Sequence, residues 1–207
     1  MAEPQDTTIV LGLTGSIGMG KSTVLTMFAE LGVPTFSADA AVHDLYAAGG
    51  AGVAPVSERF PAALQKGAID RKVLAAEVLG NTPALKDLEA IVHPLVRDAQ
   101  SCFVTNARAQ KIPLVVIEIP LLFETGAEAR LDATAVVSAG EDAQRARVLA
   151  RPGMTAKKLD AILTHQMSDA EKRRRADYII DTGQTEAATA KDVGNLISTL
   201  AHLGGKA

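Results

Sequence analysis

The stretch GLTGSIGMGKST, residues 12–23, decides how the rest of the chain is interpreted. Before it, the apolar run at residues 8–14 is rich in β-branched residues, which is typical of a buried parallel strand. Residues 15–22 fit the pattern GxxxxGK[ST], a loop whose backbone N–H groups surround phosphate oxygens. Apolar residues at helical spacing follow over Ser22–Leu31, and Gly32 provides a stop. The stretch therefore predicts a strand, a phosphate-binding loop (P-loop) and a helix in succession.

Length and composition narrow the class of protein. The 207 residues are 47% hydrophobic, which is enough for one globular unit with an insertion. The net charge of −3 gives no basic field for nucleic acid, and no window is apolar enough to span a membrane. The single cysteine, Cys102, cannot form an internal disulfide, and the N-terminus does not resemble a signal peptide. We expect a cytoplasmic protein with a small anionic partner; its oligomeric state stays open, and a monomer is compatible with the sequence.

Further apolar segments predict four more strands, at residues 33–36, 114–120, 133–139 and 176–183. Helical patterns separate most of these segments, and such alternation implies a parallel sheet that is covered on both faces. The expected fold is α/β, a three-layer α/β/α P-loop NTPase arrangement with a five-stranded parallel sheet. Its nucleotide-binding core would comprise residues 1–39, 112–140 and 176–207.

Two other regions complete the expected organisation. Residues 40–111 show helical patterns and no convincing strand, and we expect them to form a helical domain for the acceptor. In this region Pro94 is expected to start a helix. Residues 141–175 are helical and arginine-rich, and RPGMT at residues 151–155 breaks them, as expected of a lid region.

Three residues are candidates for phosphate and metal chemistry. Lys21 would reach the β- and γ-phosphates, and the Ser22 hydroxyl would bind Mg²⁺. Glu118 ends the strongest apolar strand, where a carboxylate can hold Mg²⁺ through water; the alternative is a strand-end carboxylate that is simply solvated. No guanine-specific NKxD motif is present.

Asp39 is the candidate base, because ligands of open α/β sheets bind beyond the carboxyl ends of strands and Asp39 follows one. Its alternative role is an N-cap of the helix that follows. The lid candidates are Arg145, Arg147 and Arg151, which would neutralise phosphate charge or form a solvated helix face. The run KRRR, residues 172–175, is open to the same two interpretations.

The motifs together resemble one family, the dephospho-CoA kinases. The resemblance covers nearly the whole chain and consists of six ordered motifs, GLTGSIGMGKST, LGVPTFSAD, EAIVHPLVR, VVIEIPLLFETG, QRARVLARPGMT and ADYIID. It implies a P-loop kinase with a helical substrate domain and a lid. It also implies transfer of the γ-phosphoryl group of ATP to the 3′-hydroxyl of the dephospho-CoA ribose, the last step of coenzyme A synthesis.

The resemblance also implies roles for particular residues. Those expected to bind ATP are Gly18, Met19, Gly20, Lys21, Ser22, Thr23, Arg145 and Arg151. Asp39 would be the base, with Lys21 and Arg145 also catalytic, while Asp39, His93 and Arg97 would bind the acceptor. Taken without the resemblance, His93 is as consistent with a capping or packed histidine, and Arg97 with a surface residue.

The chain departs from the family pattern at three places. Ser37 stands where a first aspartate is usual, Pro152 where the lid commonly has aspartate, and Thr182-Gly183 where an asparagine-serine pair is frequent. Two rival functions remain open at this stage. One is a P-loop kinase for a nucleoside, nucleotide or sugar, and the other is a regulatory protein that hydrolyses ATP slowly.

Overall fold

The computed structural model describes residues 8–204 and contains the predicted five-stranded sheet. Its strands lie in the order β2-β5-β1-β6-β7, and the pairs β1–β5, β1–β6 and β6–β7 are parallel. Their bounds are β1 Ile9–Thr14, β2 Thr35–Ser37, β5 Leu114–Glu118, β6 Ala133–Ser138 and β7 Tyr178–Asp181. The three-layer α/β expectation is thereby confirmed, although β5 and β7 are shorter than the apolar segments that predicted them.

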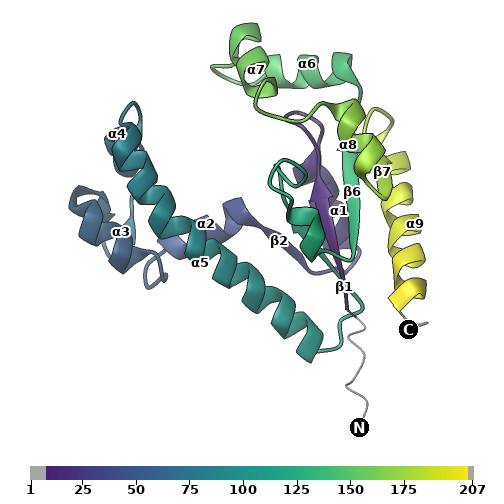
Figure 1. Cartoon of the computed structure of the whole chain (residues 1–207), viewed down its shortest axis with the longest axis horizontal. Coiled ribbons are helices and arrows are strands. Elements are labelled where there is room, and N and C mark those ends of the chain that lie inside the picture. The colour runs from purple at the N-terminus through teal and green to yellow at the C-terminus, as the bar shows by residue number, and fades with distance from the viewer. Residues whose placement is uncertain (1–7, 205–207) are drawn as a thin grey trace. The chain divides into compact units, whose positions relative to one another are not determined.

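By its internal contacts the chain forms two compact units, and β2 runs from one into the other. Unit 1 comprises residues 1–35 and 107–207, and unit 2 comprises Phe36–Asn106. The helices of unit 1 are α1 Lys21–Glu30, α6 Glu141–Leu149, α7 Ala156–Leu163, α8 Asp169–Arg175 and α9 Glu186–Gly204, with a 3₁₀ turn at Ala127–Arg130 (Figure 1).

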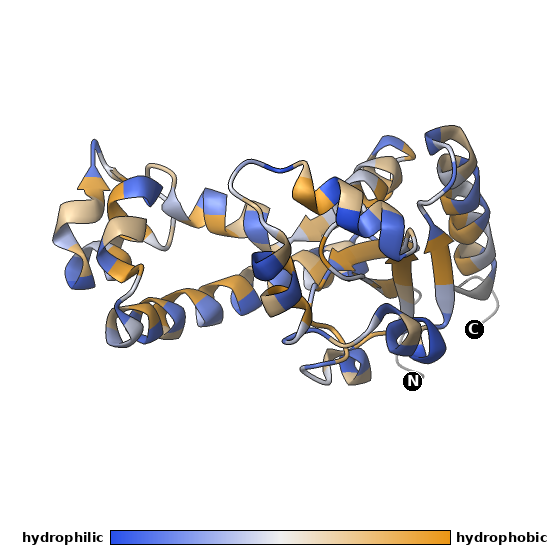
Figure 2. Cartoon of the chain, turned by 90° about the horizontal axis from the view of Figure 1, so that it is seen from above, coloured by the Kyte–Doolittle hydropathy of each residue, from blue (hydrophilic) through white to orange (hydrophobic). Residues whose placement is uncertain are grey.

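The core of unit 1 explains why these segments form a sheet. Apolar side chains of β1, β5 and β6 pack against α1 and α9, and Figure 2 shows the strands as the most hydrophobic elements of this unit. On the other side of β1, a Cβ at Gly12 would lie 2.7 Å from Leu122 and 2.3 Å from Leu131. Glycine at this position therefore lets the segment after β5 lie directly on the sheet.

Unit 2 has its own hydrophobic core, in which Phe60, Val56 and Ala63 are buried. Its elements are α2 Ala38–Tyr46, α3 Val53–Arg59, a 3₁₀ turn Pro61–Ala63, β3 Leu64–Gln65, β4 Ala68–Ile69, α4 Arg71–Val78 and α5 Thr82–Ala109, whose last turn belongs to unit 1.

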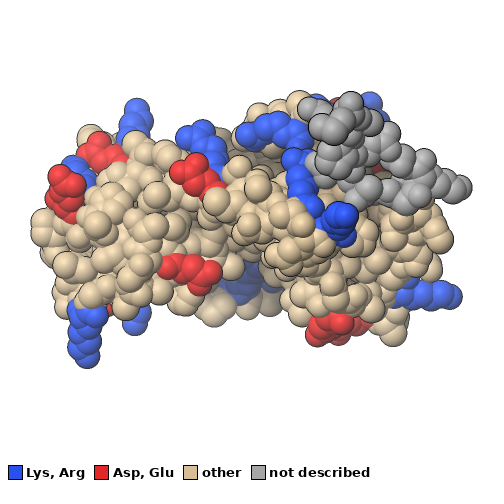
Figure 3. Space-filling view, turned by 90° about the horizontal axis from the view of Figure 1, so that it is seen from below, with Lys and Arg blue, Asp and Glu red and all other residues tan. Residues whose placement is uncertain are grey.

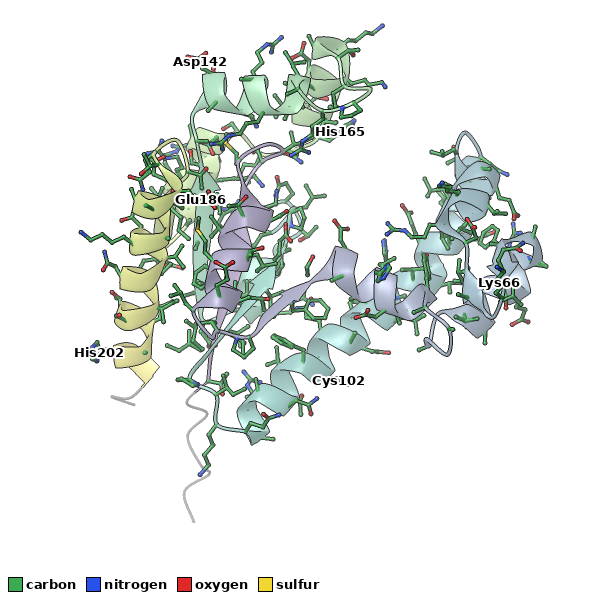
Figure 4. All side chains as sticks on the ribbon, turned by 180° about the vertical axis from the view of Figure 1, so that it is seen from behind. Lys66, Cys102, Asp142, His165, Glu186 and His202 are labelled. Carbon is green, nitrogen blue, oxygen red and sulfur yellow. The ribbon has the colours of Figure 1, made fainter. Side chains whose placement is uncertain are left out.

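Two expectations about this helical region were wrong in detail. First, β3 and β4 form a short antiparallel hairpin where no strand was predicted. Lys66 (φ +51°) and Gly67 (φ +80°) make its two-residue turn, and Figure 4 labels Lys66 at the tip. Strands of two residues are too short to give an alternating pattern, so sequence periodicity could not reveal them.

Second, Pro94 lies inside the continuous 28-residue helix α5 and does not start a helix. A proline at this position leaves the carbonyl of Ala90 without its helical N–H partner. Apolar residues of α5 that belong to the unit 2 core, among them Val92, continue the helix on both sides of the proline. Packing therefore outweighs the local preference for a break.

The described surface is mixed in charge. On the face drawn in Figure 3, basic and acidic side chains are scattered among uncharged residues, and neither kind forms a continuous field. Over residues 8–204, every helix is too short or too polar to cross a membrane.

Candidate active site

The glycine-rich loop between β1 and α1 has the backbone that phosphate binding requires. Gly18 (φ +78°) and Gly20 (φ +90°) adopt left-handed conformations that residues with a Cβ rarely reach. At Gly18 a Cβ would also lie 2.5 Å from Cγ2 of Val148 in α6. The shape of the loop therefore favours glycine at both positions, and the close approach of α6 requires it at Gly18.

The first turn of α1 provides the positive end of this site. Gly20 is the N-cap and makes no side-chain cap, so the first N–H groups of the helix stay available to an anion. Lys21 begins the helix, and its Nζ donates to the carbonyl oxygen of Gly15 at 2.9 Å. The ammonium group therefore folds back over the start of the loop, on the side where phosphates would bind.

Glu118 and Ser22 supply hard oxygen atoms at the same edge of the sheet. Glu118 is the last residue of β5 and lies in register with Leu13 of β1, which leads into the loop. Ser22 is exposed in the first turn of α1. Both residues therefore lie at the carboxyl end of β1 and β5, where a nucleotide-bound cation is expected.

A pocket of about 390 Å³ lies beside the loop in unit 1. Its lining includes Gly18, Gly20, Arg147, Arg151 and Thr182. Both arginines lie on the surface, one in α6 and one just after it. Because planar guanidinium groups stack on aromatic rings and two arginines line the pocket, it suits the nucleoside end of a bound nucleotide.

Thr182 connects this pocket to the loop. Its buried hydroxyl donates to the carbonyl oxygen of Met19 at 2.6 Å. Arg147 in turn donates to the carbonyl oxygen of Thr182 at 2.6 Å. The departure from the family pattern at Thr182 thus has a structural use, because this side chain ties β7 to the phosphate loop.

Arg145 lies in a second pocket, of about 370 Å³, together with Ser16 and Gln166. Its guanidinium contacts Asp160 of α7 at 3.3 Å, and about half of the side chain is exposed. The three arginines that the sequence offered as lid candidates therefore divide between two pockets. Arg147 shares a pocket with Arg151, whereas Arg145, which the family resemblance selected, lies in the other.

Within the KRRR run, Arg173, Arg174 and Arg175 are exposed, but Lys172 fits neither interpretation, because it is neither solvated nor open to a substrate. It is fully buried, and its Nζ lies 2.8 Å from Oε1 of Glu124. Burial of Glu124 raises the pKa of its carboxyl group, but the hydrogen bonds from Lys172 and from the N–H of Met167 outweigh this and hold it below its usual value. This ion pair fastens α8 to the segment that follows β5.

Two glutamines that the sequence did not reveal as site residues hold the phosphate loop itself. Gln144 of α6 donates to the carbonyl oxygen of Ile17 at 2.8 Å, and Gln166 accepts from the N–H of Ile17 at 3.1 Å. Glutamine in a polar, arginine-rich helical region gives no periodic or motif signal, so only the structure identifies these contacts.

The residues expected to bind the acceptor lie in unit 2. Asp39 is exposed in the first turn of α2, and Ser37 is the N-cap of that helix, so the N-cap alternative for Asp39 was wrong. His93 and Arg97 are one turn apart on α5 and exposed. Their exposure argues against the packed alternative for His93 and leaves both side chains available for a ligand.

Comparison with known sequences places the chain in a family. The family model described as dephospho-CoA kinase matches residues 9–187. A dephospho-CoA kinase of Mesorhizobium japonicum is 53% identical over 93% of this chain and 96% of its own length. A dephospho-CoA kinase of Brucella melitensis is 50% identical over 93% of this chain and 95% of its own length.

Two solved structures share the fold of this chain. The TT1252 protein of Thermus thermophilus has a TM-score of 0.72 and 36% identity, covering 95% of this chain and 98% of that one. The dephospho-CoA kinase of Campylobacter jejuni has a TM-score of 0.71 over 94% of this chain and 98% of that one; at 24% identity this likeness concerns the fold. The chain therefore belongs to the dephospho-CoA kinase family, whose members are ATP-dependent kinases.

Proposed function

We propose that this chain transfers the γ-phosphoryl group of ATP to the 3′-hydroxyl of the dephospho-CoA ribose. The observation that carries the proposal is the phosphate loop before α1, with Glu118 at the same edge of the sheet, in a chain of this family. In the reaction the bond between the γ-phosphorus and the β–γ bridging oxygen breaks. A bond from the 3′-oxygen to that phosphorus forms, and ADP leaves.

On the ATP side, the proposed residues hold charge. The N–H groups of Gly18, Met19, Gly20, Lys21, Ser22 and Thr23 would surround the phosphates, and the Lys21 ammonium would neutralise charge as it develops. Arg151, with Arg147 beside it, would line the nucleoside pocket. Arg145 would act from the neighbouring pocket, where Ser16 of the loop is also found.

Ser22 and Glu118 would hold Mg²⁺, the first directly and the second through water. The donor set fits this ion, because hydroxyl, carboxylate, water and phosphate oxygens are the hard ligands that Mg²⁺ prefers. When bound, the ion would supply positive charge that offsets part of the negative charge of the phosphates.

On the acceptor side, Asp39 would orient the 3′-hydroxyl and accept its proton, and His93 and Arg97 would bind the acceptor nucleotide. An exposed carboxylate and an exposed histidine-arginine pair within unit 2 support these roles. Residues 40–111 would then act as the acceptor domain and residues 141–175 as the lid region. The cytoplasmic location expected from the sequence stays a prediction.

The proposal is tested by an ADP-release assay with Mg-ATP and a panel of acceptors comprising dephospho-CoA, adenosine, AMP and gluconate. We expect dephospho-CoA alone to stimulate ADP release and to gain one phosphoryl group by mass. Stimulation by another member of the panel would identify a different small-molecule kinase. ATP binding without transfer to any acceptor would favour a regulatory ATPase.

A further inference from the structure

We propose that Gln144 and Gln166 are positioning residues that hold the peptide groups on either side of Ile17 and thereby link the shape of the phosphate loop to the lid region. This inference goes beyond the roles proposed above, which concern groups that contact ATP or the acceptor. It rests on the proposed function for its kinetic test only, because the contacts themselves can be measured without any substrate.

The two contacts are complementary in direction. Gln144 is only 6% exposed, and its Nε2 donates to the carbonyl oxygen of Ile17 at 2.8 Å. Gln166 presents Oε1 to the N–H of Ile17 at 3.1 Å. Because Ile17 offers one donor and one acceptor, each glutamine must use a different end of its amide. The backbone of Ile17 is thus held at both of its hydrogen-bonding groups.

The two glutamines come from different parts of the lid region. Gln144 lies in α6, and Gln166 lies between α7 and α8. Figure 4 labels Asp142 and His165, which are close neighbours of the glutamines in sequence and locate the two segments around the loop. The loop is therefore held by two lid segments that α7 connects.

Neither glutamine is free to move away easily. The helix that carries Gln144 rests on the loop, since a Cβ at Gly18 would lie 3.1 Å from the carbonyl oxygen of Gln144. The segment that carries Gln166 is fixed by the next residue, because the N–H of Met167 donates to Glu124 at 2.7 Å. Glu124 is paired with the buried Lys172, whose Nζ also donates to the carbonyl oxygen of Pro120 at 3.2 Å.

The position of Ile17 explains why this arrangement matters for the reaction. The peptide group between Ile17 and Gly18 carries the Gly18 N–H, one of the groups proposed to face the phosphates. A rotation of the Ile17 backbone would turn that N–H away. Misplacement of reacting groups by about 1 Å can cost on the order of 100-fold in rate.

The test compares substitutions that keep side-chain length and remove the hydrogen bond, Gln144→Met and Gln166→Met. Gln110→Met is the matched control, because Gln110 is exposed and lies outside the proposed site. We expect Gln144→Met and Gln166→Met each to lower kcat by about 10-fold or more, and Gln110→Met to leave kcat at the wild-type value. The kcat of the double variant should be only slightly lower than that of the more impaired single variant. Amide exchange at Ile17, followed by NMR, should accelerate in Gln166→Met, while exchange in β6 stays slow.

Conservative substitutions separate positioning from a general loss of stability. Gln166→Glu keeps an acceptor oxygen and should restore slow exchange at Ile17, whereas Gln144→Glu cannot donate and should not restore kcat. Unchanged Ile17 exchange in Gln166→Met, near-normal kcat in either methionine variant, or additive losses in the double variant would each overturn the proposal. If the Gln144 variants do not fold, the comparison of Gln166→Met with Gln166→Glu decides the matter. Absence of kinase activity in the wild type would instead refute the proposed function, and the exchange readout would still test the contacts.

Discussion

Asp39 is the residue on which the proposed chemistry depends most. Asn at this position keeps the size and can still contact the 3′-hydroxyl, but it cannot accept the proton. We therefore expect Asp39→Asn to lower kcat by about 100-fold or more with little change in the KM for ATP, because general-base catalysis contributes about 10²–10⁴-fold. Steady-state kinetics with dephospho-CoA measure this, and turnover near the wild-type rate would remove Asp39 as the base.

Lys21 should act on the phosphate side. Lys21→Met keeps the aliphatic length and removes the charge that lies over the start of the loop. We expect a loss of kcat of about 100-fold or more, the size seen when one donor to a charged transition state is removed. The variant loses the hydrogen bond to the Gly15 carbonyl but no core packing, so we expect the free energy of unfolding to fall by only about 1 kcal/mol. A variant with normal turnover would contradict its role.

Arg147 and Arg145 offer a matched pair within one helix. Arg147 contacts Thr182 beside the nucleoside pocket, whereas Arg145 contacts Asp160 and lies in the other pocket. We expect Arg147→Met to raise the KM for ATP by about 10-fold and Arg145→Met to affect mainly kcat. If both variants change the KM for ATP and kcat to the same extent, the two pockets do not bind different parts of the nucleotide.

At the scale of single elements, α8 is held by its buried ion pair. Glu124→Gln leaves the Lys172 ammonium buried without its counter-charge, so we expect the free energy of unfolding at pH 7 to fall by about 3 kcal/mol. Because folding lowers the pKa of Glu124, the stabilisation is fully present above the unfolded-state pKa of about 4.3 and is lost as the pH falls through the lower folded-state pKa. The free energies of unfolding of the wild type and of Glu124→Gln, measured with urea, should therefore converge at acid pH. A difference between them that is the same at pH 7 and at pH 3 would contradict the role of the ion pair.

Some helices and strands could be predicted from the sequence, and others could not. The five strands of the main sheet and the phosphate loop were predictable, because β-branched runs and a glycine pattern act locally, whereas the two-residue strands β3 and β4 were not. The helix through Pro94 and the burial of Lys172 were not, because each depends on packing partners distant in sequence. The same holds for the candidate site: Lys21 and Ser22 follow from the P-loop pattern and Glu118 from the end of an apolar strand, whereas Gln144, Gln166 and Thr182 depend on contacts between segments.

At the scale of the whole molecule, each of the two units has its own hydrophobic core. Unit 1 carries the candidate ATP-binding residues, and unit 2 carries Asp39, His93 and Arg97. The sequence predicted an acceptor domain at residues 40–111, whereas the contacts divide the chain at Phe36 and Asn106, so that Asp39 belongs with the acceptor residues. Under the proposed function, the candidate residues for ATP would therefore lie in unit 1 and those for the acceptor in unit 2.

The most direct test of the central claim is the position of the new phosphoryl group on the product made from Mg-ATP and dephospho-CoA. Phosphorus–proton coupling in NMR of the purified product identifies the carbon that bears it. We expect coupling to the proton on the 3′-carbon of the ribose, together with loss of periodate cleavage at the former 2′,3′-diol. A product that carries its phosphate elsewhere, or an intact diol after ATP is consumed, would contradict it.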